Sequence, residues 1–248
     1  MIESEDEIRF QLSAPIKDPQ VAAFRSRAPM LNDLAISHRL SLHAGRSKYG
    51  LPDDFAFAIK SVESVVHAGD EVEGYHVSLR FEITSKRRDT ITGLRSTLET
   101  RAGAKTRVTN TSFSVMPPAL ANFVRRGRNY LDFADVKIGR DQSQLSTIGD
   151  NHFRYYPAEA DRLSDGRRVD HVPALTLIDI ALSVNAMINE GDISSNISAE
   201  FLNYCDPRQA FDIVEKKDQS ALEFVQDGQA VAVMVFSPQS QSSCVFCG

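Results

Sequence analysis

Between Phe55 and Val115, apolar side chains recur at every second residue in four successive segments. This period of two is typical of strands that bury one face and expose the other. The first half of the chain is therefore predicted to contain a meander of long antiparallel strands. The predicted strands cover residues 55–59, 75–83, 91–98 and 108–115, and Pro117 and Pro118 follow the last of them.

A strand and a long helix are predicted before this meander. Residues Ile8 to Ser13 alternate like a strand, and residues Asp18 to about Ser47 carry apolar side chains with helical spacing. Gly50 and Pro52 are predicted to end that helix, because glycine favours a helix C-terminus and proline cannot continue the hydrogen-bond ladder.

The second half of the chain repeats this order of elements. A short strand near residues 153–157 precedes a helix from about Pro173 to Glu190, and strands follow at 197–204, 210–216, 221–226 and 230–236. A helix on a curved antiparallel sheet is a stable α+β layering, and in this order it is the hotdog fold. The order therefore predicts a tandem (double) hotdog, with a long helix wrapped by a curved antiparallel sheet in each half. The predicted units are a first repeat (1–122), a connector (123–137), a second repeat (138–238) and a flexible tail (239–248).

Composition excludes several classes of function. The chain has 248 residues, is 42% hydrophobic and has a net charge of −5, with basic residues scattered among acidic ones, which argues against a nucleic-acid partner. The acidic N-terminus does not resemble a signal peptide, and no apolar run approaches the roughly 20 residues that span a bilayer. We therefore expect a cytoplasmic protein without a membrane partner. Cys244 and Cys247 form a lone C-x-x-C, to which we assign no metal or redox role.

The carboxylate of Asp179 lies within an apolar run, RVDHVPALTLIDIA, at residues 168–181. On helical spacing it shares a face with Leu175, Thr176 and Leu182 or Ser183, which places it on or beside the stripe that faces the core. Asp179 is then either a surface residue at the edge of this stripe or a buried carboxylate that is paired, protonated or facing a polar pocket.

The segment around Asp179 resembles two groups of hotdog enzymes. HVPALTLIDIA is similar to the segment of hotdog β-hydroxyacyl-acyl-carrier-protein dehydratases in which a catalytic acid follows six residues after a proline. VDHVPALTLIDIA more closely resembles the Asp-His-Val-Pro-Gly signature of the A-factor (γ-butyrolactone) biosynthesis family, whose members carry two hotdog repeats. SKYGLPDDFAFAIKSV, VKIGR and AEFLNYCDPRQAFDI extend this resemblance over most of the chain. The sequence departs from the signature at Ala174, where glycine is usual, at Asp179, where glutamate is usual, and at Leu182-Ser183, where Arg-Gln is common.

This resemblance implies an acyltransferase that moves a β-ketoacyl group from acyl carrier protein to the hydroxyl of dihydroxyacetone phosphate, without a cofactor. The implied partners are an acyl carrier protein or acyl-CoA thioester and a phosphorylated hydroxyl acceptor. Asp179 or His171 would be the base, Asp170 would orient the imidazole, and the N–H of Ala174 would bind the thioester carbonyl. Arg167 and Arg168 would bind the phosphate.

Each of these residues also has a structural interpretation. His171 and Asp170 could cap the helix, and Arg167 and Arg168 could form a solvated turn. The first half carries Asp33, His38 and His43 near its helix in no recognisable spacing. Two other functions therefore stay open, namely a hotdog dehydratase or thioesterase and a non-catalytic hotdog that binds an acyl chain or a partner. The chain is expected to be a monomer of two repeats or a homodimer.

Overall fold

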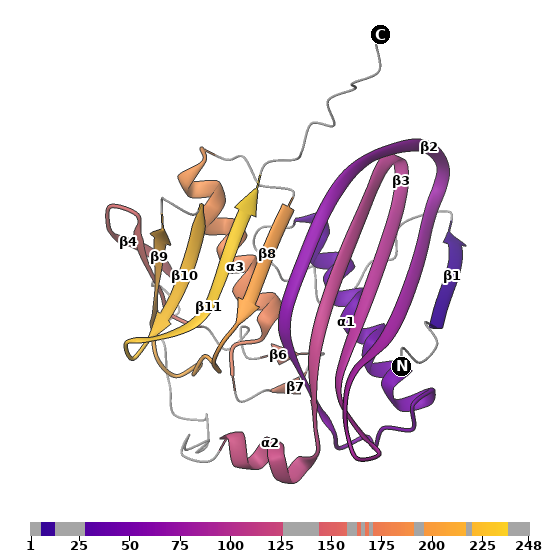
Figure 1. Cartoon of the computed structure of the whole chain (residues 1–248). Coiled ribbons are helices and arrows are strands. Elements are labelled where there is room, and N and C mark those ends of the chain that lie inside the picture. The colour runs from indigo at the N-terminus through magenta and orange to yellow at the C-terminus, as the bar shows by residue number, and fades with distance from the viewer. Residues whose placement is uncertain are drawn as a thin grey trace.

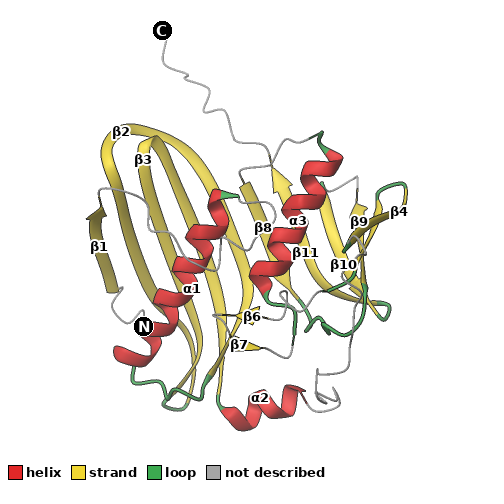
Figure 2. Cartoon of the chain, turned by 180° about the vertical axis from the view of Figure 1, so that it is seen from behind, coloured by secondary structure: helices red, strands yellow, loops and turns green. Residues whose placement is uncertain are grey.

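The computed structural model describes residues 6–12, 28–125, 144–157, 163–164, 167–168, 171–190, 196–216 and 220–237. In these ranges a nine-stranded antiparallel sheet is covered on one face by helices α1 and α3 (Figures 1 and 2). The strands lie in the order β1-β2-β8-β11-β10-β9-β5-β4, and β3 pairs with β2. The elements are β1 (Asp6–Leu12), α1 (Pro29–Ser47), β2 (Ala56–Arg87), β3 (Thr90–Met116), α2 (Pro118–Arg125), β4 (Leu145–Gly149), β5 (His152–Tyr155), β6 (Leu163–Ser164), β7 (Arg167–Arg168), α3 (Ala174–Ile188), β8 (Asn196–Phe201), β9 (Phe211–Lys216), β10 (Ala221–Gln226) and β11 (Gln229–Ser237).

Strands β2 and β3 each rise along the sheet, arch over and return (Figure 1). The four strands predicted between residues 55 and 115 are thus the limbs of two continuous strands. The arches fall where the pairing of β2 with β3 shifts register, between Ala68 and Tyr75. Gly74 and Gly103 have φ angles of 83° and 57° there, a left-handed conformation that glycine adopts without steric cost. The two limbs of β3 lie side by side, since the Thr97 hydroxyl donates to Asn110 at 2.9 Å.

The two helices share one core across the sheet. Strand β2 pairs with β8 over Ser61 to Ser64, so the part of the sheet beneath α1 continues into the part beneath α3. One cluster of buried apolar residues joins both helices, with Leu31 and Leu34 of α1 and Ile178 and Leu182 of α3 among its members. Each such fully buried side chain contributes about 1.5–3 kcal/mol, so the two halves of the chain stabilise each other.

The predicted elements agree with the structure in type and differ at their ends. The strand predicted at residues 8–13 is β1, and the helix predicted at 173–190 is α3. The first helix ends at Ser47 as predicted, and the N–H of Leu51 closes its last turn on the carbonyl of Gly45 at 3.0 Å. The described helix begins at Pro29, and residues 13–27 lie outside the described ranges, as does most of the predicted connector. Helix α2 overlaps the start of that connector.

An ion pair between β5 and β9 gives the sheet a predictable pH dependence. The guanidinium of Arg154 binds both carboxylate oxygens of Asp212, at 2.7 and 3.0 Å, and its hydrogen bonds lower the pKa of Asp212. A carboxyl group whose pKa is lower in the folded than in the unfolded chain stabilises the fold at pH values above the unfolded-state pKa of about 3.9. This stabilisation is lost as pH falls through the lower pKa of the folded state. We expect Asp212→Asn to lower the urea midpoint at pH 7 and to differ less from the wild-type chain at pH 3.

The exposed acid Asp54 supplies the control for this measurement. Asp54→Asn is expected to leave the urea midpoint close to that of the wild-type chain at both pH values. An Asp212→Asn deficit of equal size at pH 7 and pH 3 would show that the ion pair is not its source.

Candidate functional site

Helix α3 begins after a proline, whose side chain has no polar atom to cap the helix. Its N-cap residue is Pro173, and the first turn contains no acidic residue. The first hydrogen bond of the helix runs from the N–H of Leu177 to the carbonyl of Pro173 at 3.0 Å. Helical geometry therefore gives no partner to the N–H groups of Ala174, Leu175 and Thr176. Such donors, aligned with the helix dipole, suit an anion or a developing oxyanion.

Asp179 lies in the second turn of α3 and is buried, with 3% of its surface exposed. Of the two interpretations that the sequence left open, the buried carboxylate is confirmed and the surface residue is wrong. Leu175, Thr176 and Leu182, predicted to share its face, are buried as well. Ser183, one turn further on, donates its hydroxyl to the main-chain carbonyl of Asp179 at 3.0 Å. The helix thus holds an acidic group inside the core, within two turns of its N-terminus.

His171 lies two residues before the N-cap of α3 and is half-buried. Its ring packs edge-on against Tyr204, with the ring centroids 5.0 Å apart. Pro173 is the N-cap residue of α3, so His171 is not the N-cap itself. The capping and catalytic interpretations of His171 both stay predictions. The sequence predicts a helix that begins at about Pro173, but the ψ angle of Pro173, 149°, is extended, so the first helical residue is Ala174.

The structure describes only some of the other predicted site residues. Ala174 is the first residue of α3 and is half-buried. Arg167 and Arg168 form the short strand β7, which pairs with Leu163 and Ser164 of β6. Asp170 lies outside the described residues, as do Cys244 and Cys247. The phosphate-binding role of the two arginines and the orienting role of Asp170 stay predictions.

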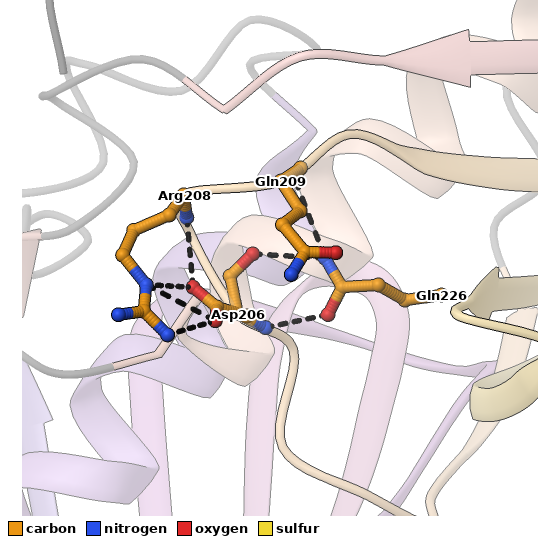
Figure 3. A network of polar contacts seen from close by, with 4 residues as sticks. All are labelled: Asp206, Arg208, Gln209 and Gln226. Carbon is orange, nitrogen blue, oxygen red and sulfur yellow. Dashed lines mark hydrogen bonds and ion pairs between the residues drawn. The ribbon is translucent and has the colours of Figure 1, made fainter. Parts of the chain in front are cut away.

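The loop after β8 buttresses the approach to α3, and the sequence analysis did not identify this role. The N–H of Val172 donates to the carbonyl of Cys205 at 2.9 Å. Beyond Cys205, Asp206 accepts hydrogen bonds from the main chain and the guanidinium of Arg208 (Figure 3). The sequence signal for this turn is Asp-Pro-Arg, because aspartate commonly accepts a bond from the N–H two residues on.

Gln226 of β10 fastens this loop to the sheet. Its amide oxygen accepts from the N–H of Asp206 at 2.7 Å, and its amide nitrogen donates to the carbonyls of Asp206 and Gln209 at 2.9 and 3.3 Å (Figure 3). The side chain is buried. One residue thus satisfies three main-chain groups of a loop that contacts His171 and Val172.

Gln226→Leu is expected to destabilise the fold by about 1–3 kcal/mol, because three main-chain groups lose a partner that leucine cannot replace. Urea unfolding followed by circular dichroism measures the change. Gln209→Leu is the matched control, since Gln209 is exposed and offers Gln226 its main-chain carbonyl. Equal stability of the Gln226→Leu and Gln209→Leu variants would contradict this role of Gln226.

A second buried carboxylate, Asp33, lies in the second turn of α1 with 6% of its surface exposed. Tyr75 and Thr100 donate their hydroxyls to its two oxygens at 3.1 and 3.2 Å. The Nε atom of Arg107 lies 3.3 Å from Oδ2 of Asp33, and a further nitrogen of Arg107 donates to Ser64. The sequence places Asp33 near the first helix, but its partners were not predictable. Of the two histidines near the same helix, His43 is exposed and His38 packs near the ring of Phe113.

Burial raises the pKa of Asp33, and Arg107 with the two hydroxyl donors opposes that rise. The pKa of Tyr75 is also raised, by burial and then by the neighbouring Asp33. Both oxygens of Asp33 are therefore occupied by donors from the first half of the chain. This arrangement suits a carboxylate that fixes α1 on the sheet, whereas a catalytic base needs an oxygen that faces its substrate.

Among the described residues, no group of three or more histidines, cysteines and acids could hold a metal ion, and no helix is long and apolar enough to span a membrane. No family model and no curated protein matches the sequence. The resemblance to the A-factor family therefore stays a prediction.

Several solved structures match nearly the whole chain. The 12:0-ACP thioesterase from Umbellularia californica has a TM-score of 0.53 and 16% identity, and the match covers 94% of this chain and 97% of that one. An acyl-ACP thioesterase from Bacteroides thetaiotaomicron has a TM-score of 0.53 and 11% identity, with 94% and 98% covered. HtdX of Mycobacterium tuberculosis has a TM-score of 0.53 and 13% identity, with 92% and 98% covered. Identities this low establish the architecture alone, and the chain therefore has the hotdog fold.

Proposed function

We propose that this protein is an enzyme that hydrolyses acyl thioesters at the N-terminus of α3. The observation that carries the proposal is the buried carboxylate of Asp179, close to a helix N-terminus whose N-cap residue is Pro173. Two of the structures that share the fold over almost the whole chain are named as acyl-ACP thioesterases. The substrate is accordingly an acyl chain joined through a thioester to acyl carrier protein or to coenzyme A.

The proposed reaction needs an oxyanion site and a base. The thioester carbonyl accepts hydrogen bonds from the first N–H groups of α3, of which that of Ala174 is the first. Asp179, or His171 acting as the proton carrier, takes a proton from water as the water oxygen bonds to the carbonyl carbon. The carbon–sulfur bond then breaks, the acid is released, and the proton passes to the departing sulfur. Asp170 is proposed to orient the imidazole.

A second candidate function is acyl transfer to a phosphorylated hydroxyl acceptor such as dihydroxyacetone phosphate. The motif Asp170-His171-Val172-Pro173, which resembles the A-factor signature, favours it. The hydroxyl of the acceptor would replace water as the nucleophile, and Arg167 and Arg168 would bind its phosphate. The two functions use the same base and the same oxyanion donors, so the identity of the product separates them.

We further propose that the chain consists of two hotdog repeats, at residues 1–122 and 138–238, with a connector at 123–137 and a tail at 239–248. The presence of one long helix over each part of the sheet supports this division (Figure 2). Helices α1 and α3 also carry their buried carboxylates at nearly the same position, the fifth and sixth helical residues. A protein of this kind acts as a monomer of two repeats or as a homodimer.

Mass spectrometry of acyl-thioester reactions tests the proposed function. The full chain is incubated with saturated, β-hydroxyacyl and β-ketoacyl thioesters, with and without dihydroxyacetone phosphate. Free acid without the acceptor is the expected result. If an ester forms only when the acceptor is present, the function is acyl transfer and not hydrolysis. Loss of water from the β-hydroxyacyl thioester would identify a dehydratase. If every substrate stays unchanged, the protein is not an acyl-thioester enzyme, and the remaining hypothesis is a non-catalytic hotdog that binds an acyl chain or a partner.

A further inference from the structure

A groove of about 500 Å³ opens on β1, the second limb of β2 and the first limb of β3. Cross-strand pairs bring its residues together: Arg9 pairs with Ser78, Gln11 with His76, and His76 with Arg101. On β2, residues 76, 78 and 80 alternate with the buried residues 75, 77 and 79. The lining consists of Arg9, Gln11, Val72, His76, Val77, Ser78, Arg80, Glu99 and Arg101.

The groove is positive on a protein that is negative as a whole. Its lining contains three arginines and one glutamate, a net charge of +2 with His76 neutral, whereas the chain carries −5. Glu99 lies 2.5 Å from Arg101 and balances that guanidinium. All three arginines are exposed at the groove. A concave surface with an excess of positive charge concentrates anions, and guanidinium groups bind phosphate oxygens in pairs.

The volume of the groove indicates the size of its ligand. Sites for small molecules usually measure about 300–1,000 Å³, which is far more than one phosphate group fills. The half-buried side chain of Val72 adds an apolar surface beside the arginines. The groove thus combines cations for a phosphate with space and an apolar contact for an organic group.

We propose that this groove binds a phosphorylated small molecule of nucleotide size, with Arg9 and Arg80 on its phosphate groups. The ligand is separate from the thioester substrate. Helix α3 covers β8 to β11, whereas β1 lies at the opposite end of the sheet in both views (Figures 1 and 2). This inference therefore holds or fails independently of the function proposed for α3.

Isothermal titration calorimetry of the full chain with ADP, pyrophosphate and phosphate tests the proposal at constant ionic strength. ADP is expected to bind saturably at one site and more tightly than pyrophosphate, because the organic group adds contacts. Arg80→Gln and Arg9→Gln are expected to weaken ADP at least tenfold. Both residues are exposed, so their replacement leaves the core intact.

Arg95 supplies the matched control, because it is exposed, lies on the same limb of β3 and is not part of the groove. Arg95→Gln is expected to bind ADP as the wild-type chain does. If Arg95→Gln and Arg80→Gln weaken ADP binding equally, the effect comes from the overall charge of the protein, and the proposed site is wrong. Absence of ADP binding would overturn the site as well. If pyrophosphate binds as tightly as ADP, the organic group makes no contact with the groove, and the proposal of a nucleotide-sized ligand is wrong.

Discussion

Asp179→Asn is expected to lower kcat for thioester hydrolysis by roughly 100- to 10,000-fold, the usual contribution of a general base. Asparagine has nearly the shape of aspartate and cannot accept the proton from water. Asp179 is buried in the second turn of α3, so the amide occupies the same position in the core. Steady-state kinetics with the thioester that the wild-type chain turns over best measures the loss, with kcat and KM determined separately.

Ser183→Ala is the control for this substitution. Ser183 lies one turn beyond Asp179 and bonds to its main-chain carbonyl, so alanine removes a nearby hydroxyl and leaves the carboxylate in place. We expect its kcat to stay within about twofold of the wild-type value, since the base and the donors of the oxyanion site are retained. Wild-type turnover by a folded Asp179→Asn variant would remove Asp179 from the mechanism and make His171 the remaining candidate for the base.

Arg107→Met is expected to destabilise the fold by about 2–4 kcal/mol, somewhat below the usual cost of removing one partner of a fully buried ion pair, because Asp33 is buried and Arg107 is half-buried. Methionine fills much of the volume of the arginine stem but leaves the carboxylate of Asp33 without its guanidinium. Asp33 then keeps the hydroxyl donors Tyr75 and Thr100, which carry no charge. Urea unfolding at pH 7 measures the difference in the free energy of unfolding.

The double variant Asp33→Asn/Arg107→Met completes a double-mutant cycle, which tests the interaction between the same two residues. Asparagine still accepts a hydroxyl bond and carries no charge, so the double variant is expected to be more stable than Arg107→Met alone. Additive losses from Asp33→Asn and Arg107→Met would show that the two side chains do not interact.

The pH dependence of Arg107→Met has a definite sign. Burial already raises the pKa of Asp33 beside Arg107, and loss of the guanidinium removes the largest influence that lowers it. The pKa therefore rises further, and the folded state binds the proton more tightly than before. The variant then loses stability as pH rises above about 3.9, the pKa of an aspartate in the unfolded chain, and it regains stability as pH falls toward that value. The deficit of Arg107→Met should therefore be smaller at pH 4 than at pH 7.

The acid of α3 was predictable from the sequence, whereas the acid of α1 was not. Asp179 interrupts an apolar run, and its spacing from Leu175 and Leu182 placed it on or beside the face toward the core, so that burial was one of two interpretations. Asp33 stands among mixed residues, and its hydroxyl donors are 42 and 67 residues away in the chain. The same holds for Gln226, which is 20 residues from Asp206 and has no local signal for its role.

By itself the sequence indicated whether most of the longer segments are strands or helices, because the period of apolar side chains is a local property that each segment carries in its own residues. It also placed Asp179 on or beside the inner face of its helix, and the tertiary structure decided that the carboxylate is buried. The tertiary structure alone decided that residues 55–115 form two arched strands and that β2 joins β8. It also decided that Asp33 meets Arg107 and that three arginines line one groove. These contacts depend on strand order and register, which arise when distant segments pack together and which no single segment encodes.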